Sequence, residues 1–327
     1  MTSRTSLLPL LLSLALIATL TTGCRFFAGE SPPEPVSLGG GEPVLLQPGG
    51  QQLLLVREGS ESFEGWLFSV DRAEARKILD FMTPSFYPAF SPDGRQLAWA
   101  TDQLWLADDT GSNPMALIDD QRTLGPIAWS PDGQELAVVI DDTIVRIDRQ
   151  GRQLGEIAQA ESIRQLAWVS LEDGRQRILF NSFPDDEPAF IASIDPTGVD
   201  PTRLVQGEAF AIAGDRLYFS NSLEGGGLNV ASVEDGSGAE QIVSATIWQF
   251  APRPGQPTQV AYIVQDDQGG TALWLLDHGA GRPRQLTEGQ PVFSPVWSED
   301  GASIYYGRFN PNAAEEEDFA LLEKIDL

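Results

Sequence analysis

The chain has 327 residues, of which 42% are hydrophobic, so it is long enough to bury a large core. It carries 47 acidic residues against 21 basic ones, which argues against nucleic acid as a partner, because phosphate binding needs clustered Lys and Arg. A single cysteine excludes an intramolecular disulfide, and a single histidine leaves little for metal ligation or for acid–base chemistry near neutral pH.

Residues 1–23 have the features of an export signal. Arg4 precedes an apolar run from Leu7 to Leu20, and the small residue Gly23 stands before Cys24. This order is typical of a leader that is cleaved off, and the run is too short for a comfortable membrane span. An ordinary secretory signal with an incidental cysteine is the alternative interpretation.

The segment Leu-Thr-Thr-Gly-Cys at 20–24 resembles the lipobox of bacterial lipoproteins, with Thr21 where Leu is commonest. The resemblance implies that Cys24 is acylated and becomes the first residue of the mature protein, anchored by its lipid to a membrane. Arg25, not Asp, follows the cysteine, which implies the periplasmic side of the outer membrane in a Gram-negative host. In another host we expect the outer face of the plasma membrane. Residues 24–42, rich in Pro and Gly, are predicted to form a tether.

Residues 43–327 contain one unit repeated seven times. The turn sequence Ser-Pro-Asp-Gly at 91–94 recurs at 130–133 and, with Glu in place of Pro, at 298–301. With the weaker copies, the turn glycines recur about every 40 to 45 residues, which is the period of a four-stranded propeller blade. The sequence therefore predicts an all-β fold, a seven-bladed β-propeller of four-stranded antiparallel blades. Six blades plus a divergent cap is the alternative, because the first and last repeats are the weakest.

The repeated residues are predicted to be structural. Ser, Pro, Asp and Gly favour a tight turn, so the turn aspartates are hairpin formers and not catalytic groups. The tryptophans before the turns are predicted to pack between blades. The seventh repeat ends at its third strand, so residues 35–38 are expected to supply the missing outer strand and to close an open sheet edge.

These repeats, with an aromatic residue before the turn and Leu-Ala-aromatic after it, resemble the WD-repeat-like propellers of TolB and of prolyl-oligopeptidase N-terminal domains. The resemblance covers about residues 35–327 and implies a propeller that binds proteins or peptides. TolB's additional α/β domain has no counterpart in this sequence, so TolB's partner contacts are not implied. No Gly-x-Ser-x-Gly motif is present, so the hydrolase activity of the oligopeptidases is not implied either.

One face of the predicted ring is expected to be acidic. Loops joining strands two and three share a face with the loops between blades, and most of the excess negative charge falls in them. A field of one sign attracts ligands of the other sign, so we hypothesise that a basic segment of an envelope protein docks there. A solvated surface with no partner is the alternative. The residues predicted to bind the partner are Asp141, Asp142, Asp185, Asp186, Glu187, Asp266, Asp267, Glu315, Glu316, Glu317 and Asp318.

The sequence thus predicts a monomeric, membrane-tethered binding scaffold without catalytic residues, metal or cofactor. Two other functions stay open: a propeller enzyme of the hydrolase or lyase kind, and a protein that binds Ca²⁺ or saccharide. His278, the one candidate for acid–base chemistry, falls in a predicted surface turn. No loop has the spaced Asp-x-Asp-x-Asp pattern that calcium sites favour.

Overall fold

The computed structural model describes residues 35–58, 62–82, 86–118, 123–221, 226–265, 269–279, 281–312 and 320–327. These residues form 28 strands and no helix, so none of them makes a helix able to span a membrane. The predicted export signal, Cys24 and most of the predicted tether lie outside the described residues.

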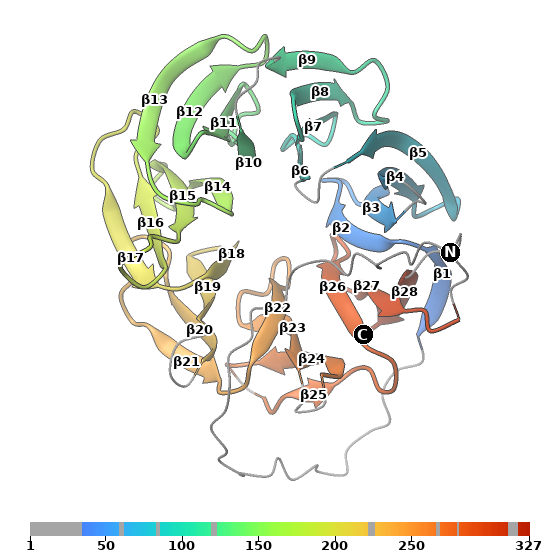
Figure 1. Ribbon diagram of the computed structural model, residues 1–327. Coiled ribbons are helices and arrows are strands. Elements are labelled where there is room, and N and C mark those ends of the chain that lie inside the picture. The colour runs from blue at the N-terminus through green and yellow to red at the C-terminus, as the bar shows by residue number, and fades with distance from the viewer. Residues whose placement is uncertain are drawn as a thin grey trace, which may run out of the picture. The chain divides into compact units, whose positions relative to one another are not determined.

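The strands form seven antiparallel four-stranded sheets, arranged as blades around a central opening (Figure 1). The predicted seven-bladed propeller is therefore confirmed, and the alternative of six blades plus a cap is wrong. The first three blades are β2 (Glu42–Leu46), β3 (Gln52–Glu58), β4 (Phe63–Ser69) and β5 (Glu74–Phe81); β6 (Tyr87–Phe90), β7 (Gln96–Ala100), β8 (Leu104–Asp108) and β9 (Met115–Ile118); and β10 (Leu124–Trp129), β11 (Glu135–Ile140), β12 (Thr143–Asp148) and β13 (Gln153–Gln159).

The remaining blades follow the same order, and the first strand of every blade lines the opening (Figure 1). Blades 4 to 6 are β14 (Leu166–Ser170), β15 (Gln176–Ser182), β16 (Phe190–Ile194) and β17 (Thr202–Gln206); β18 (Ala209–Ala213), β19 (Arg216–Asn221), β20 (Gly227–Ser232) and β21 (Glu240–Val243); and β22 (Ile247–Pro252), β23 (Gln259–Gln265), β24 (Thr271–Asp277) and β25 (Arg284–Gln285). Blade 7 is β26 (Val292–Trp297), β27 (Ser303–Phe309), β28 (Ala320–Asp326) and β1 (Val36–Gly40).

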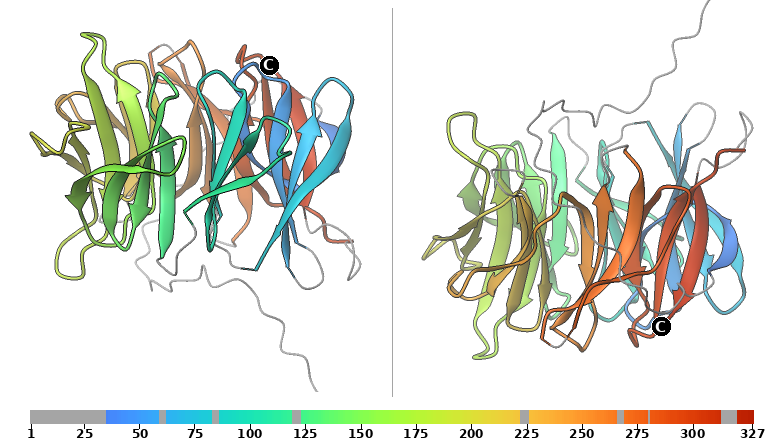
Figure 2. Two further views of the ribbon diagram at one scale, coloured as in Figure 1. Left: turned by 90° about the horizontal axis from the view of Figure 1, so that it is seen from above. Right: turned by 90° about the horizontal axis from the view of Figure 1, so that it is seen from below.

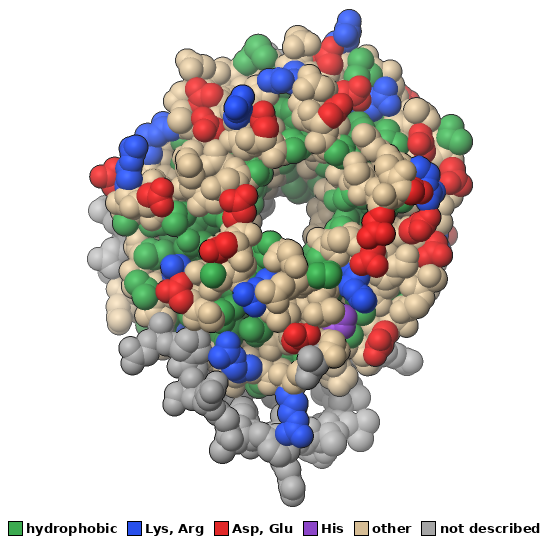
Figure 3. All heavy atoms as spheres, turned by 180° about the vertical axis from the view of Figure 1, so that it is seen from behind, with side chains coloured by type: hydrophobic (Ala, Val, Ile, Leu, Met, Phe, Trp, Pro, Cys, Tyr) green, Lys and Arg blue, Asp and Glu red, His purple; other side chains and the backbone are tan. Residues whose placement is uncertain are grey.

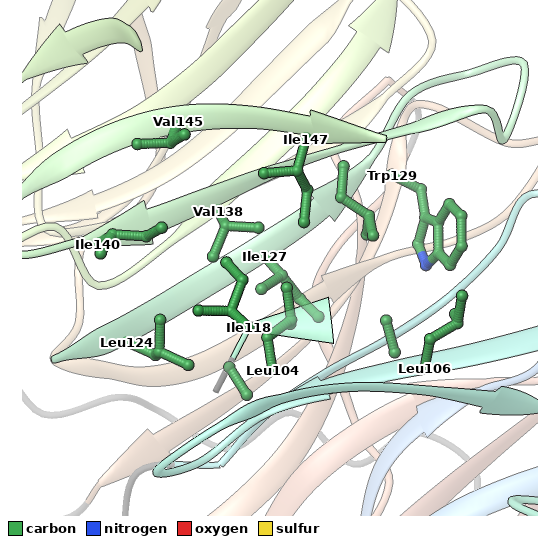
Figure 4. Packing of buried hydrophobic residues seen from close by; sticks show 13 residues of the cluster. Leu104, Leu106, Ile118, Leu124, Ile127, Trp129, Val138, Ile140, Val145 and Ile147 are labelled. Carbon is green, nitrogen blue, oxygen red and sulfur yellow. The ribbon is translucent and has the colours of Figure 1, made fainter. Parts of the chain in front are cut away.

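The core lies between the blades. The second strand of each blade is almost wholly buried, because it is covered by a neighbouring sheet on both sides; Leu53, Leu54 and Leu55 of β3 are fully inaccessible. A strand that is buried on both faces has a continuous run of apolar residues. The short apolar run after each turn in the sequence is therefore the second strand of a blade. Figure 4 shows one interblade cluster, to which blades 2 and 3 contribute Leu104, Leu106, Ile118, Leu124, Ile127, Trp129, Val138, Ile140, Val145 and Ile147.

The Ser-Pro-Asp-Gly turns have the structural role that the sequence predicted. Ser91 Oγ donates to Asp93 Oδ1 at 2.6 Å, and the same carboxylate oxygen accepts from the backbone N–H of Arg95 at 3.1 Å. Gly94 has φ of 68°, which glycine adopts without strain. The hydrogen bond from Ser91 lowers the pKa of Asp93, so the carboxylate is held ionised as part of the turn. Equivalent bonds join Ser130 to Asp132 and Ser298 to Asp300.

Two of the tryptophans before the turns connect neighbouring blades. Trp129 Nε1 donates to the carbonyl of Ala89 in blade 2 at 3.0 Å, and Trp297 Nε1 donates to the carbonyl of Ala251 in blade 6 at 2.8 Å. Both rings are buried. Trp168 instead bonds Gln176 within its own blade. The predicted packing between blades is therefore confirmed for Trp129 and Trp297, and Trp168 also packs against a cluster that joins blades 3 and 4.

The ring is closed by the strand nearest the N-terminus. β1 pairs antiparallel with β28, with Val36 opposite Lys324 and Gly40 opposite Leu321. Leu38 of this strand packs against a buried cluster that joins blades 7 and 1. β1 thus occupies the position that the sequence assigned to the segment before the first repeat, and the last blade has no open outer edge at β28.

Candidate binding face and channel mouth

The loops of the propeller lie on two faces, because every strand runs from one side of the ring to the other (Figure 2). We call the acidic face the one that carries the loops between second and third strands and the loops between blades. The turn face carries the Ser-Pro-Asp-Gly-type turns and the loops between third and fourth strands. Figure 3 shows the turn face, where acidic and basic side chains are interspersed around the central opening.

Asp141 and Asp142 form the tip of the hairpin between β11 and β12 on the acidic face. Both have positive φ, 48° and 64°, as a two-residue hairpin turn requires. Asp141 Oδ1 accepts from the backbone N–H of Thr123 at 2.9 Å, and Asp142 Oδ1 accepts from that of Ser162 at 3.1 Å. These two predicted partner-binding residues therefore also hold the interblade loops on either side of blade 3, a role that the sequence analysis missed.

Asp185, Asp186 and Glu187 lie exposed in the next blade, in the loop between β15 and β16. The backbone N–H of Asp185 donates to Glu161 Oε2 at 3.3 Å, and Glu161 precedes the serine that Asp142 binds. The predicted residues of blades 3 and 4 are thus brought into one continuous acidic stretch. Glu187 is partly neutralised by Arg203, 2.8 Å away. The other predicted residues, Asp266, Asp267, Glu315, Glu316, Glu317 and Asp318, lie outside the described residues.

A buried amide supports this part of the face. Asn181 is 1% exposed, and its Oδ1 accepts from the backbone N–H groups of Arg164 and Gln165 at 2.9 and 2.7 Å. Its Nδ2 donates to the carbonyl of Glu208 at 2.6 Å. Gln165 in turn accepts from the backbone N–H of Phe210 at 2.8 Å. Blades 4 and 5 are therefore joined by polar bonds that hold the loops of the acidic face in place.

A second polar group lies where the inner strands begin, at the acidic-face end of the central opening. Glu42 of β2, Ser294 of β26 and Gln249 of β22 come from blades 1, 7 and 6. Ser294 Oγ donates to Glu42 Oε1, and the backbone N–H of Ser294 donates to Gln249 Oε1 at 2.5 Å. We call these three residues and Trp248 the channel mouth.

The inner strands are irregular at the channel mouth. The ladder of β26 is interrupted after Phe293, and Ser294 there has φ of 54°, an unusual value for a serine. β2 and β22 are interrupted at Val44 and at Trp248. Such bulges are over-represented beside functional sites, where they re-aim side chains. None of these residues was predicted to form a site, although Pro295 within a run of apolar residues is a sequence signal for a bulge.

Burial raises the pKa of Glu42, because desolvation disfavours its charge more than the hydroxyl of Ser294 favours it. A carboxyl with a raised folded-state pKa contributes its full stability below its unfolded-state pKa and loses it as pH rises through the folded-state value. Ionised Glu42 therefore destabilises the folded protein at neutral pH.

We expect Glu42→Gln, which keeps an acceptor for Ser294, to raise the free energy of unfolding at pH 7. The gain should disappear below about pH 4, where both variants are neutral. Denaturant unfolding at the two pH values measures this. Glu299→Gln makes the same change at an exposed glutamate on the turn face and is the control. A Glu42→Gln variant no more stable than wild type at pH 7 would contradict the expectation.

Large apolar side chains are also exposed on the acidic face. Met82 is 77% exposed, Trp248 52% and Phe309 42%. Met82 comes directly after Phe81 in the chain. The ring of Phe81 stacks on those of Phe63 and Phe86, with centroid distances of 5.6 Å and 4.6 Å respectively. Aromatic residues and methionine are enriched at protein interfaces, so these side chains are candidate anchors for a partner.

His278 lies in the predicted turn between β24 and β25, but it is half-buried and not a free surface residue. Its Nε2 is 3.0 Å from the hydroxyl of Tyr218 in blade 5. That hydroxyl also donates to the carbonyl of Pro257, and burial raises the pKa of Tyr218 to about 12. The histidine thus joins blades 5 and 6 on the turn face. Within the described ranges, no three His, Cys, Asp or Glu side chains are grouped to hold a metal ion.

No protein-family model matches the sequence, and no curated protein does. Solved structures do match. An oligogalacturonate lyase in complex with manganese is 13% identical with a TM-score of 0.69, over 90% of this chain and 93% of that one. The β-propeller domain of the Trilobed protease from Pyrococcus furiosus is 14% identical with a TM-score of 0.61, over 88% and 95%. A putative TolB from Agrobacterium tumefaciens is 19% identical with a TM-score of 0.53, over 83% and 99%.

The likeness is one of fold. At these identities the solved structures establish the β-propeller fold and carry no activity over to this chain. The protease propeller is described as having an open velcro topology. In the present chain, by contrast, β1 pairs with β28 and closes the last blade.

Proposed function

We propose that the protein is an exported, lipid-anchored propeller that binds a basic segment of a cell-envelope protein on its acidic face. The observation that carries the proposal is the joint placement of acids and exposed apolar side chains there. Asp185 and Asp186 are exposed in the continuous acidic stretch of blades 3 and 4, and Trp248 and Phe309 are exposed on the same face. The turn face offers mixed charges instead (Figure 3).

Each component has a physical role in such binding. The acidic stretch raises the rate of encounter with a basic segment, and this effect weakens as salt screens the charges. Exposed aromatic side chains provide the apolar anchors that supply most of the affinity at protein interfaces. Hydrogen bonds of Asp141, Asp142 and Asn181 hold the loops in one arrangement, so little order has to be gained on binding.

The same charges argue against a lyase acting on acidic sugar chains. Oligogalacturonate is a polyanion, and a face with this charge would repel it. We therefore prefer the binding scaffold to an enzyme, and the likeness to the lyases concerns the fold. Acylation of Cys24 would keep the scaffold at a membrane, and the Pro- and Gly-rich segment after it would let the propeller stand away from the surface.

The proposal is tested by cross-linking intact cells that carry the tagged protein and identifying what co-purifies. We expect an envelope protein to be recovered with wild type and lost with Cys24→Ser, which removes the anchor. It should also be lost with Asp185→Asn, Asp186→Asn and Glu187→Gln combined. A matched control neutralises three exposed turn-face acids, Glu172→Gln, Asp215→Asn and Glu299→Gln, and should retain the partner. Loss with the control variant but not with the acidic-face variant would refute the proposal.

A further inference from the structure

We propose that the channel mouth is a binding site for a protonated primary amine, which the lysine side chain of a docking segment supplies. The inference deepens the proposed function and rests on it for the source of the amine. The site itself consists of Glu42, Ser294, Gln249 and Trp248, none of which belongs to the acidic stretch of blades 3 and 4.

One carboxylate oxygen of Glu42 is available to accept a hydrogen bond from a ligand. Its Oε1 accepts the hydroxyl hydrogen of Ser294, while Oε2 bonds to no residue in the described part of the chain. No lysine, arginine or histidine among the described residues forms an ion pair with Glu42. A desolvated carboxylate without a cation costs free energy, and its raised pKa reflects that cost. A cation delivered by a ligand would offset it.

The serine that orients Glu42 is itself fixed. Gln249 Oε1 accepts from the backbone N–H of Ser294, and Gln249 Nε2 donates to Ser294 Oγ at 3.4 Å. These two bonds hold Ser294 at its positive φ and leave its hydroxyl hydrogen for Glu42. Residues from three blades therefore fix the orientation of one carboxylate. Apolar packing between the blades does not need these polar bonds, so we assign them to a binding site.

Exposed apolar residues that adjoin Glu42 and Gln249 on the same strands favour an alkylammonium over other cations. Trp248, next to Gln249 in the chain, is 52% exposed, and Val44 at the bulge of β2 is 37% exposed. An aromatic face attracts an ammonium group, and apolar walls cover the methylene stem of a lysine side chain. A divalent metal ion is disfavoured, because Ca²⁺ takes six to eight oxygen ligands and this site offers one free carboxylate oxygen.

The test titrates the intact protein with pentalysine by calorimetry at physiological salt. We expect Glu42→Gln to weaken binding about tenfold, the lower end of the coupling measured for close charge pairs. Trp248→Phe should also weaken it, while the turn-face control Glu299→Gln should leave the affinity unchanged. The peptide acetylated at its N-terminus and at all five lysine side chains has no ammonium group, and it should bind neither wild type nor Glu42→Gln. Unfolding curves establish that each variant is folded.

The outcomes separate this inference from the proposed function. Pentalysine affinity unchanged by Glu42→Gln, but reduced by neutralising 185–187, would overturn the amine site and leave the docking face standing. Affinity reduced by Glu42→Gln alone would support the amine site and remove the docking face. A further experiment adds n-butylamine as a competitor of pentalysine. If n-butylamine displaces pentalysine from wild type but not from Glu42→Gln, the site is supported; equal displacement from both proteins overturns it.

Discussion

Deletion of residues 36–40 is expected to abolish cooperative folding of the ring. These residues are the whole of β1, so the deletion exposes the edge of β28 and removes Leu38 from the cluster that joins blades 7 and 1. The lost strand pairing and apolar burial amount to several kcal/mol, out of the roughly 5–15 kcal/mol by which a typical domain is stable. An open edge also offers a template for aggregation.

Chemical unfolding followed by circular dichroism, together with size-exclusion chromatography, measures this effect. The deletion variant should show a broad transition at much lower denaturant concentration and a soluble aggregate. Val36→Thr changes the exposed first residue of the same strand and serves as the control, with an expected effect within about 0.5 kcal/mol. A deletion variant that unfolds at the wild-type midpoint would show that β1 contributes nothing to closure.

Replacement of Asn181 by Leu is expected to cost about 3 to 5 kcal/mol of stability, because each buried group left without a partner costs about 1–3 kcal/mol. The substitution leaves the backbone N–H groups of Arg164 and Gln165 and the carbonyl of Glu208 without their partner. Two neighbouring blades are joined by these bonds, so the loops of the acidic face should loosen as well.

Thermal unfolding and amide hydrogen exchange test this prediction together. The melting temperature should fall by several degrees, and protection should be lost first at residues 164–165. Asn312→Ala, at an exposed asparagine that follows β27 in blade 7, is the control and should change little. If Asn181→Leu unfolds at the wild-type temperature, the buried amide does not organise the acidic face.

Most of the fold could be predicted because its signals are local. The turn around Gly94 has chemistry that allows few other structures, and the spacing of such turns gives the blade count. The closing strand could be predicted because the last repeat has only three strands of its own and a blade needs four. In the acidic face, the sequence indicated which loops carry the charge but not which carboxylates bind backbone groups. The Asp141-Asp142 pair between two apolar strands is itself a signal for a tight hairpin.

The channel mouth could not be predicted in the same way. Glu42, Gln249 and Ser294 are far apart in the sequence, and closure of the ring is needed to bring Glu42 of blade 1 beside Ser294 of blade 7. A bulge shifts the register by one residue, so alternation in the sequence gives the wrong face for the side chains around it. The contact of His278 with Tyr218 was missed for the same reason, because sixty residues separate them.

The central claim, that a basic segment docks on the acidic face, is tested most directly by the salt dependence of one affinity. The cross-linked partner, once purified, is titrated against the intact protein and against the variant neutralised at 185–187, at low and at physiological salt. We predict that wild type binds more tightly at low salt and that the variant loses most of this gain, because screening and neutralisation remove the same interaction. An affinity that neither salt nor the substitutions change would contradict docking on the acidic face.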